Sequence, residues 1–296
     1  EPFTTGVPLS AGPIDIRNMN IEGILRDLGV HPQSWITWTL EKGHFDKFGG
    51  TIFPLSLEGP MEFATKNFEI FDRPATDPSR GHMLGFAEAK LHANFTIRPT
   101  GIIFDDVLIE SPKSVLRSRV SLQFRKYLEA QLFEGTRIDL SELTPLKNIP
   151  WSGIAEVTAI GRGPFNRPEI EADVAISNFN FSVFSFGDIE HARVFFEPFD
   201  IHVSDAHLRK GDSRVAVPNL HVDFDAIPGV VVDADIDTHS APHLWAHDFY
   251  DIVGMGDDPR FADLDVNASG TARLRFVQGG PEDRCGGGRL RVKTRM

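Results

Sequence analysis

The sequence alternates apolar and polar residues over unusually long segments. In "FADLDVNASGTARLRF" (261–276), every second residue from Ala262 is apolar or small, and each residue between them is polar. This period of two indicates a β-strand with one dry and one wet face. At about 3.3 Å per residue the segment would run on the order of 50 Å, against roughly 17–20 Å for an ordinary strand.

The same alternation recurs in "FAEAKLHANFTIRP" (86–99), "EIEADVAIS" (169–177), "RVAVPNLHVDFDA" (214–226) and "VVVDADID" (230–237). Its phase shifts by one residue near Ser177–Asn178 and breaks at Pro218–Asn219, so we expect a bulge or kink at each point. The predicted apolar face comprises Ala89, Leu91, Phe95, Ile97, Ile170, Val174, Ile176, Val215, Val217, Leu220, Val222, Phe224, Val232, Ile236, Leu264, Val266, Leu274 and Phe276.

Period two with one wet face is typical of antiparallel strands covered on one side only. We therefore predict an all-β fold: an elongated, curled antiparallel sheet forming a groove, with a few short capping helices. Helical spacing places those helices over 20–30, 125–135 and 241–256.

Two pairs of segments also align along the chain. "SGIAEVTAIGRGP" (152–164) resembles "SGTARLRFVQGGP" (269–281), and 104–124 resembles 204–224, giving weak repeats near 87–176 and 199–281. Residues 1–296 show no clear boundary. Because the chain opens Glu-Pro-Phe without a Met, we interpret it as one elongated segment of a longer protein.

Composition narrows the function classes. The net charge of -12 argues against nucleic acid as a partner, because phosphate binding needs a concentrated basic surface. Cys285 is the single cysteine, so the chain has no internal disulfide framework. No apolar run approaches the length of a membrane-spanning helix.

The best candidate for chemistry is "THSAPHLWAHDFYD", in which His243, His247 and Asp251 would share one face of a helix and could ligate zinc. A general base within the pair and a second group of ligands are both missing. The sequence therefore predicts no enzyme, no catalytic residue, no metal and no cofactor.

Residues 140–176, with "SGIAEV" and "GPFNRPEIEADVAI", and residues 199–224, with "FDIHVSDAHLRKGDSRVAV" and "LHVDF", resemble the TamB family of bacterial envelope proteins, within the wider AsmA-like group. Residues 35–72 are similar to its large members. The resemblance implies an apolar β-groove in the periplasm of a Gram-negative bacterium, an inner-membrane anchor outside this segment, and an outer-membrane partner of the TamA (Omp85) type. It also implies phospholipid as cargo and a role in outer-membrane assembly.

Three hypotheses follow. The first is a groove segment that carries the acyl chains of phospholipid between the two membranes. The second is a structural or scaffolding β-module, a closed sandwich or adhesin-like array without lipid cargo. The third is a metal enzyme centred on His243 and His247.

Overall fold

The computed structural model describes residues 6–20, 23, 36–71, 76–78, 82–124, 127–143, 150–164, 168–181, 184–197, 200–224, 226, 230–239, 244–251, 265–277 and 288–295. Strands make up 79% of the structure, and no helix reaches seven residues in this described part. The predicted all-β, antiparallel class with only short helices is confirmed. The chain divides into two compact units.

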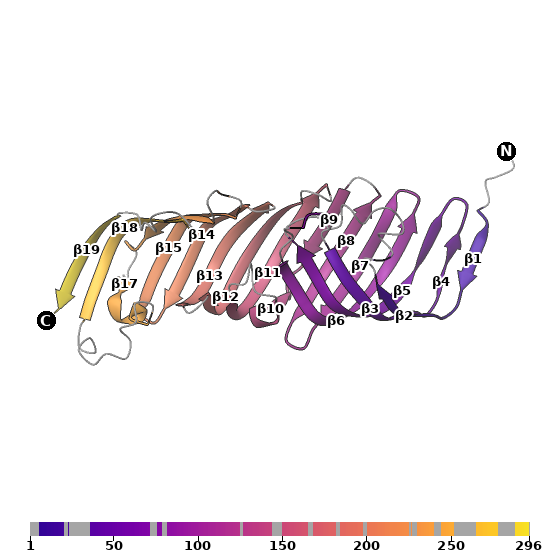
Figure 1. Ribbon diagram of the computed structural model, residues 1–296, viewed down its shortest axis with the longest axis horizontal. Coiled ribbons are helices and arrows are strands. Elements are labelled where there is room, and N and C mark those ends of the chain that lie inside the picture. Colours follow the sequence, from indigo (N-terminus) through magenta and orange to yellow (C-terminus); the bar gives the residue numbers. More distant parts are fainter. Residues whose placement is uncertain are drawn as a thin grey trace. The chain divides into compact units, whose positions relative to one another are not determined.

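Unit 1 comprises Glu1–Asn148 and Val157–Glu169. Its strands pair mainly with their neighbours in the chain, in antiparallel register (Figure 1). They are β1 (Pro8–Ala11), β2 (Ile14–Asn20), β3 (Ile36–Phe45), β4 (Phe48–Thr51), β5 (Ser56–Phe71), β6 (His82–Arg98), β7 (Gly101–Glu110), β8 (Val115–Gln123), β9 (Tyr127–Leu132) and β10 (Arg137–Asp139), followed by the 3₁₀ turn η2 (Leu140–Glu142). The second half of β11 (Trp151–Gly163) pairs with β9.

Unit 2 comprises Ile149–Glu156 and Ile170–Met296. Successive strands again pair antiparallel (Figure 1). Both β16 and β17 pair with β18. The elements are β12 (Glu169–Phe181), β13 (Phe184–Glu197), β14 (Asp200–Lys210), β15 (Ser213–Asp223), β16 (Val231–Asp237), β17 (Leu244–Trp245), the 3₁₀ turn η3 (Ala246–Phe249), β18 (Asp265–Val277) and β19 (Gly288–Arg295).

Unit 1 buries an aromatic core on one face of its sheet. Met61, Ala93, Phe95 and Val107 are buried together, and Phe45 is among the half-buried residues packed against them. The Phe45 and Phe95 rings meet edge to face, with centroids 5.4 Å apart. Such a pair adds to the stabilisation that comes from burial alone.

Gly59 of β5 makes this aromatic packing possible. It lies opposite Phe95 in the register of β5 and β6. A Cβ atom at Gly59 would lie 2.9 Å from the Phe48 Cβ and 2.5 Å from the Lys47 carbonyl oxygen, closer than real Cβ contacts allow. The Phe48 and Phe95 rings therefore approach to 6.3 Å beside a residue without a side chain.

Several long strands contain one Asn or Asp in the left-handed conformation. The positions with φ near +52° are Asn18, Asn67, Asp106, Asn178 and Asp205. Asn and Asp tolerate this conformation better than other non-glycine residues, which is why they occupy it. At most of these points the pairing register shifts, and a bulge of this kind bends the strand locally.

The helix predicted over 125–135 is wrong. Residues 127–132 form β9, which pairs with β8 on one side and β11 on the other. The segment "YLEAQL" consists largely of helix-forming residues but also alternates Leu128, Ala130 and Leu132 with polar residues. Pairing on both edges outweighs the small intrinsic preference for helix.

The other two predicted helices are only partly visible. Of 20–30, the structure describes residues 20 and 23. Within 241–256, the short strand β17 precedes η3, so the described residues form one 3₁₀ turn in place of a continuous helix.

Each unit contains a buried serine, at the start of the second strand of a hairpin, whose hydroxyl is hydrogen-bonded to a 3₁₀ turn. In unit 1, the Ser114 hydroxyl donates to Glu142 Oε2 of η2 at 2.5 Å and accepts from the Asp139 amide at 2.9 Å. In unit 2, the Ser213 hydroxyl donates to Asp248 Oδ2 of η3 at 2.6 Å and accepts from the Trp245 amide at 2.8 Å. Each serine ties a 3₁₀ turn to the sheet.

A buried threonine accompanies each serine. The Thr136 hydroxyl exchanges hydrogen bonds with the backbone of Arg117, and the Thr238 hydroxyl does so with Gly270. Ser114, Ser213, Thr136 and Thr238 are the largest side chains that are almost completely buried in the described part of the chain. Ser114 and Ser213 lie within the segments 104–124 and 204–224, which align in the sequence.

Replacing either serine removes a buried partner. We expect Ser114→Ala and Ser213→Ala each to lower the free energy of unfolding by about 1–3 kcal/mol, because a carboxylate oxygen and a backbone amide lose their hydrogen bond. Denaturant titration measures the change. Ser204→Ala, at an exposed position of β14, is the control and should change stability by less than about 0.5 kcal/mol. Equal free energies of unfolding for Ser213→Ala and wild type would contradict the stabilising role of these hydrogen bonds.

Candidate functional site

Six strands of unit 2 align their apolar residues into continuous rows. The first row, taken directly from the pairing register, runs Ala172, Val194, Val203, Leu220, Ala234 and Leu274. The second runs Ile170, Phe196, Ile201, Val222 and Val232. Residues two apart in a strand share a face, so both rows lie on one side, here called the apolar face of unit 2.

The larger side chains of this face stay only half-buried. Every buried hydrophobic residue in the described part of unit 2 is an alanine: Ala155, Ala192, Ala206 and Ala268. Val203, Leu220 and Val222 are of intermediate exposure, and Leu274 is 44% exposed. Unit 1 differs, because there Met61 and Phe95 are 5% exposed.

The bulge predicted near Ser177–Asn178 is present and keeps the face continuous. The register between β12 and β13 shifts between Ile176 and Phe179, and Asn178 has φ of 54°. Without the extra residue, Phe179 would point to the opposite side from Ile176. The bulge thereby extends the apolar strip of β12 into Phe179 and Phe181.

An aromatic group closes this end of the strip. The Phe179 ring lies 5.9 Å from Phe186 and 6.5 Å from Phe181, and Phe184 lies 6.5 Å from Phe186. Phe184 is 38% exposed. The hairpin end of β12 and β13 therefore presents accessible aromatic surface.

The break predicted at Pro218–Asn219 also exists, and two strands share it. The register of β15 against β16 shifts between Ala216 and Asn219, whereas β15 stays in register with β14 across the same point. On β14 the left-handed residue Asp205 lies between Ser204 and Ala206. Both strands change phase together, so Val203 and Ala206 remain on the face of Leu220 and Val217.

The opposite face of unit 2 is mostly polar, with Phe195, opposite His202, as an apolar exception. One row places Asp173, Arg193, Ser204, Asn219, Asp235 and Arg273 side by side. Ion pairs across it are long and exposed, as between Arg193 Nε and Asp173 at 3.6 Å. The alternation read from the sequence thus separates two chemically distinct surfaces.

The predicted apolar residues divide between the units. Ala89, Leu91, Phe95 and Ile97 lie on β6 in unit 1, where Phe95 is buried and Leu91 and Ile97 pack against the core. Most of the others lie on the apolar face of unit 2, with Phe224 just beyond the end of β15. Leu264 lies outside the described residues, and the side chain of Phe276 is not described.

The histidine-rich segment does not form the predicted shared helix face. His247 lies in η3 with its Nε2 3.4 Å from Asp248, whereas Asp251 accepts hydrogen bonds from the Lys210 ammonium at 2.7 and 2.8 Å. His243 and Cys285 fall outside the described residues. Two of the three candidate ligands thus contact other residues.

Comparison with known proteins gives no relative: neither the family models, nor the curated proteins, nor the solved structures contain a match. Among the described residues, no helix has the length and apolar character needed to span a bilayer.

Asp188 holds the bulge of β12 in place. Its carboxylate accepts a hydrogen bond from the Asn178 amide at 2.9 Å and another from the Arg209 guanidinium at 2.7 Å. The backbone hydrogen bond from Asn178, with a further contribution from Arg209, lowers the pKa of Asp188. Both bonds favour the charged form.

This lowered pKa makes the bulge sensitive to acid. The stabilisation by Asp188 is complete above the unfolded pKa of about 3.9 and is lost as pH falls through the lower pKa of the folded state. We expect Asp188→Asn to cost about 1 kcal/mol at pH 6 and progressively less below pH 4. Denaturant unfolding across this pH range measures it. The control Asp173→Asn, in an exposed ion pair, should cost almost nothing. A constant cost for Asp188→Asn at all pH values would contradict the assignment.

Proposed function

We propose that the chain is a segment of a lipid-transfer protein of the bacterial envelope, in which the apolar face of unit 2 holds acyl chains of phospholipid. The observation that carries the proposal is the exposure pattern of that face. Valine, leucine and isoleucine side chains from six adjacent strands stay half-exposed, and the buried hydrophobic residues in the described part of unit 2 are all alanines. Contiguous exposed apolar surface of this kind is typical of an interaction site.

The energetics of acyl chains suit such a surface. Transferring hydrocarbon out of water gains about 0.8 kcal/mol per CH₂, so a chain of about sixteen carbons represents on the order of 13 kcal/mol. A face that is apolar along several strands offsets much of the free-energy cost of exposing the acyl chain to water, wherever along the face the chain lies. A bound chain can move along it without becoming fully hydrated, and no residue has to perform chemistry.

The aromatic residues fit the same role. Phe179, Phe181, Phe184 and Phe186 lack a polar group, so they offer dry surface without a hydrogen-bonding requirement. The resemblance of residues 140–176 and 199–224 to the TamB family supports a place in the periplasm, between an inner-membrane anchor and an outer-membrane partner of the TamA type. These partners are part of the proposal.

A charge placed in the middle of the face should prevent lipid binding. Leu220 lies in the centre of the first row, between Val203 and Ala234. We expect Leu220→Asp to weaken acyl-chain binding at least about tenfold, because a carboxylate next to hydrocarbon must be desolvated. Phospholipid per mole of purified protein, measured by mass spectrometry, and titration with a fluorescent fatty acid give the two readouts.

Asn219→Asp is the matched control, because it adds the same charge one residue away on the polar face. It should retain wild-type lipid content, and circular dichroism checks that both variants keep their strands. Equal lipid content in Leu220→Asp and wild type would refute the proposal. If the wild-type protein carried no lipid and bound little of a dye for apolar surface, the structural β-module would be the better explanation.

A further inference from the structure

Three potential metal ligands converge on the polar face of the β14–β15 hairpin. His202 on β14 lies directly opposite His221 on β15, and Asp200 lies two residues before His202 on the same side of the strand. Directly opposed residues and residues two apart on one strand are the closest neighbours on a sheet face. The backbone pairing therefore brings the three side chains together without any loop having to be ordered.

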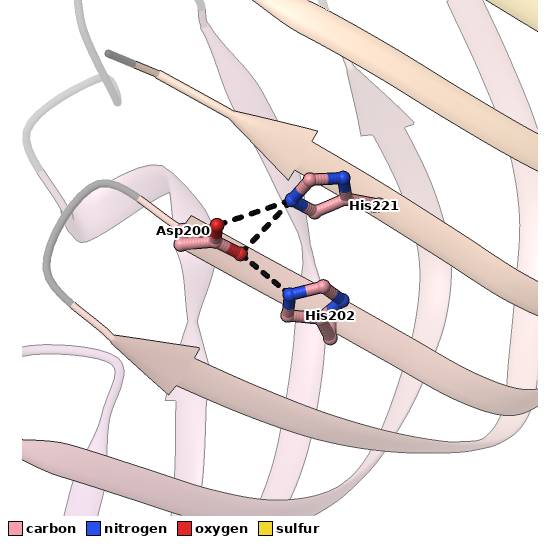
Figure 2. A group of neighbouring side chains, drawn as sticks. All are labelled: Asp200, His202 and His221. Carbon is pink, nitrogen blue, oxygen red and sulfur yellow. Dashed lines mark hydrogen bonds and ion pairs between the residues drawn. The ribbon is translucent and has the colours of Figure 1, made fainter. Parts of the chain in front are cut away.

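Their polar atoms point toward one another, as Figure 2 shows. Asp200 Oδ1 lies 2.7 Å from His202 Nε2 and 3.0 Å from His221 Nε2. The two imidazole rings stack with centroids 4.3 Å apart and planes 5° from parallel. One ligand atom from each of the three residues lies within 4.8 Å of the other two.

These distances suit a small divalent ion. Zinc binds imidazole nitrogen and carboxylate oxygen at about 2.0–2.2 Å, and tetrahedral coordination separates its ligand atoms by about 3.3 Å. The oxygen–nitrogen distances of 2.7 and 3.0 Å are shorter than that value, so small side-chain rotations that move these atoms apart accommodate the ion. We propose that Asp200, His202 and His221 form a binding site for one divalent transition-metal ion of the zinc class, with solvent completing the coordination.

The charge around the cluster favours a cation. Asp223 lies opposite Asp200, and Asp233 of β16 lies opposite His221. The Oδ1 atom of Asp233 is buried and has no hydrogen-bond partner among the described residues. Arg273 Nη2 forms a long ion pair with that atom at 4.0 Å, and Arg275 Nε lies 3.8 Å from the other oxygen, so both arginines are paired with Asp233.

Histidine–carboxylate pairs alone do not define the site, because each of the nine described histidines lies within 4.0 Å of a carboxylate. The pairs outside the cluster involve His44, His82, His92, His191, His207, His239 and His247. Only the cluster at Asp200 brings three ligand atoms together in the described part of the chain. Asp205, between His191 and His207 on the same face, provides a comparison with the same residue types.

A bound ion would join β14 to β15 from the polar side. The side chains of Ile201, Val203 and Val222, which alternate with the ligands, point to the apolar face. The ion would therefore stabilise the hairpin without occupying the surface proposed for acyl chains. This inference stands independently of the proposed function.

Calorimetric titration of the chelator-treated protein with Zn²⁺ tests the site. We expect one ion per chain bound by this cluster, a rise in the unfolding temperature, and shifts of the ring resonances of His202 and His221 in the NMR spectrum. Mg²⁺ and Ca²⁺ should have no such effect, because they prefer sites built from oxygen ligands. His202→Ala and Asp200→Asn should each weaken Zn²⁺ binding at least about tenfold.

His207→Ala is the matched control and should bind Zn²⁺ as the wild type does. Asp200→Asn preserves the shape of the side chain, so loss of binding in that variant cannot be attributed to misfolding. The proposal is overturned if the wild type binds no Zn²⁺, or if His202→Ala and His207→Ala bind it equally well.

Discussion

Strand register is the constraint on which both surfaces of unit 2 depend. Side chains alternate strictly across a strand, so a slip of one residue would exchange the apolar and polar faces of that strand. The pairings of β12 to β18 bring Leu220 beside Val203 and Ala234, and the same pairings bring His221 beside His202 and Asp233. One register therefore specifies an apolar surface and a polar cluster on its two sides.

The bulges preserve this arrangement where the sequence departs from simple alternation. Asn178 and Asp205 adopt left-handed conformations, and Asp188 fixes the first of them through a backbone hydrogen bond. Each irregularity inserts one residue so that the next apolar side chain returns to its original face. Local strain at an Asn or Asp is small beside the cost of placing a phenylalanine or valine among charged residues.

The sequence predicted the faces well and the helices poorly. Alternation identified the apolar residues of β15 and both phase changes, because period two is a local property of the chain. The helix prediction failed at β9, because "YLEAQL" fits both a helical spacing and a strand alternation. Pairing with β8 and β11 decides in favour of the strand. The buried Ser213 was also missed, because its partner Asp248 lies 35 residues further along the chain.

The cluster at Asp200 was within reach of the sequence. A two-residue turn at Gly211 and Asp212 places His202 opposite His221. The position of the turn in the sequence is therefore enough to predict this pair. Spacing along the chain indicates only His243 and His247 as candidate ligands, because they are close together in the sequence. Ligands on a sheet are instead neighbours across strands, at separations set by the turn.

The claim that the apolar face is open to hydrocarbon can be tested directly by photocrosslinking along β15. A photoreactive amino acid is placed at successive positions from Val215 to Val222, and adducts with phospholipid are identified by mass spectrometry. We expect adducts at Val215, Val217, Leu220 and Val222, and none at Ala216, Asn219 or His221 on the polar side. Equal labelling of the two sets, or crosslinks from the apolar set only to the chain itself, would contradict it.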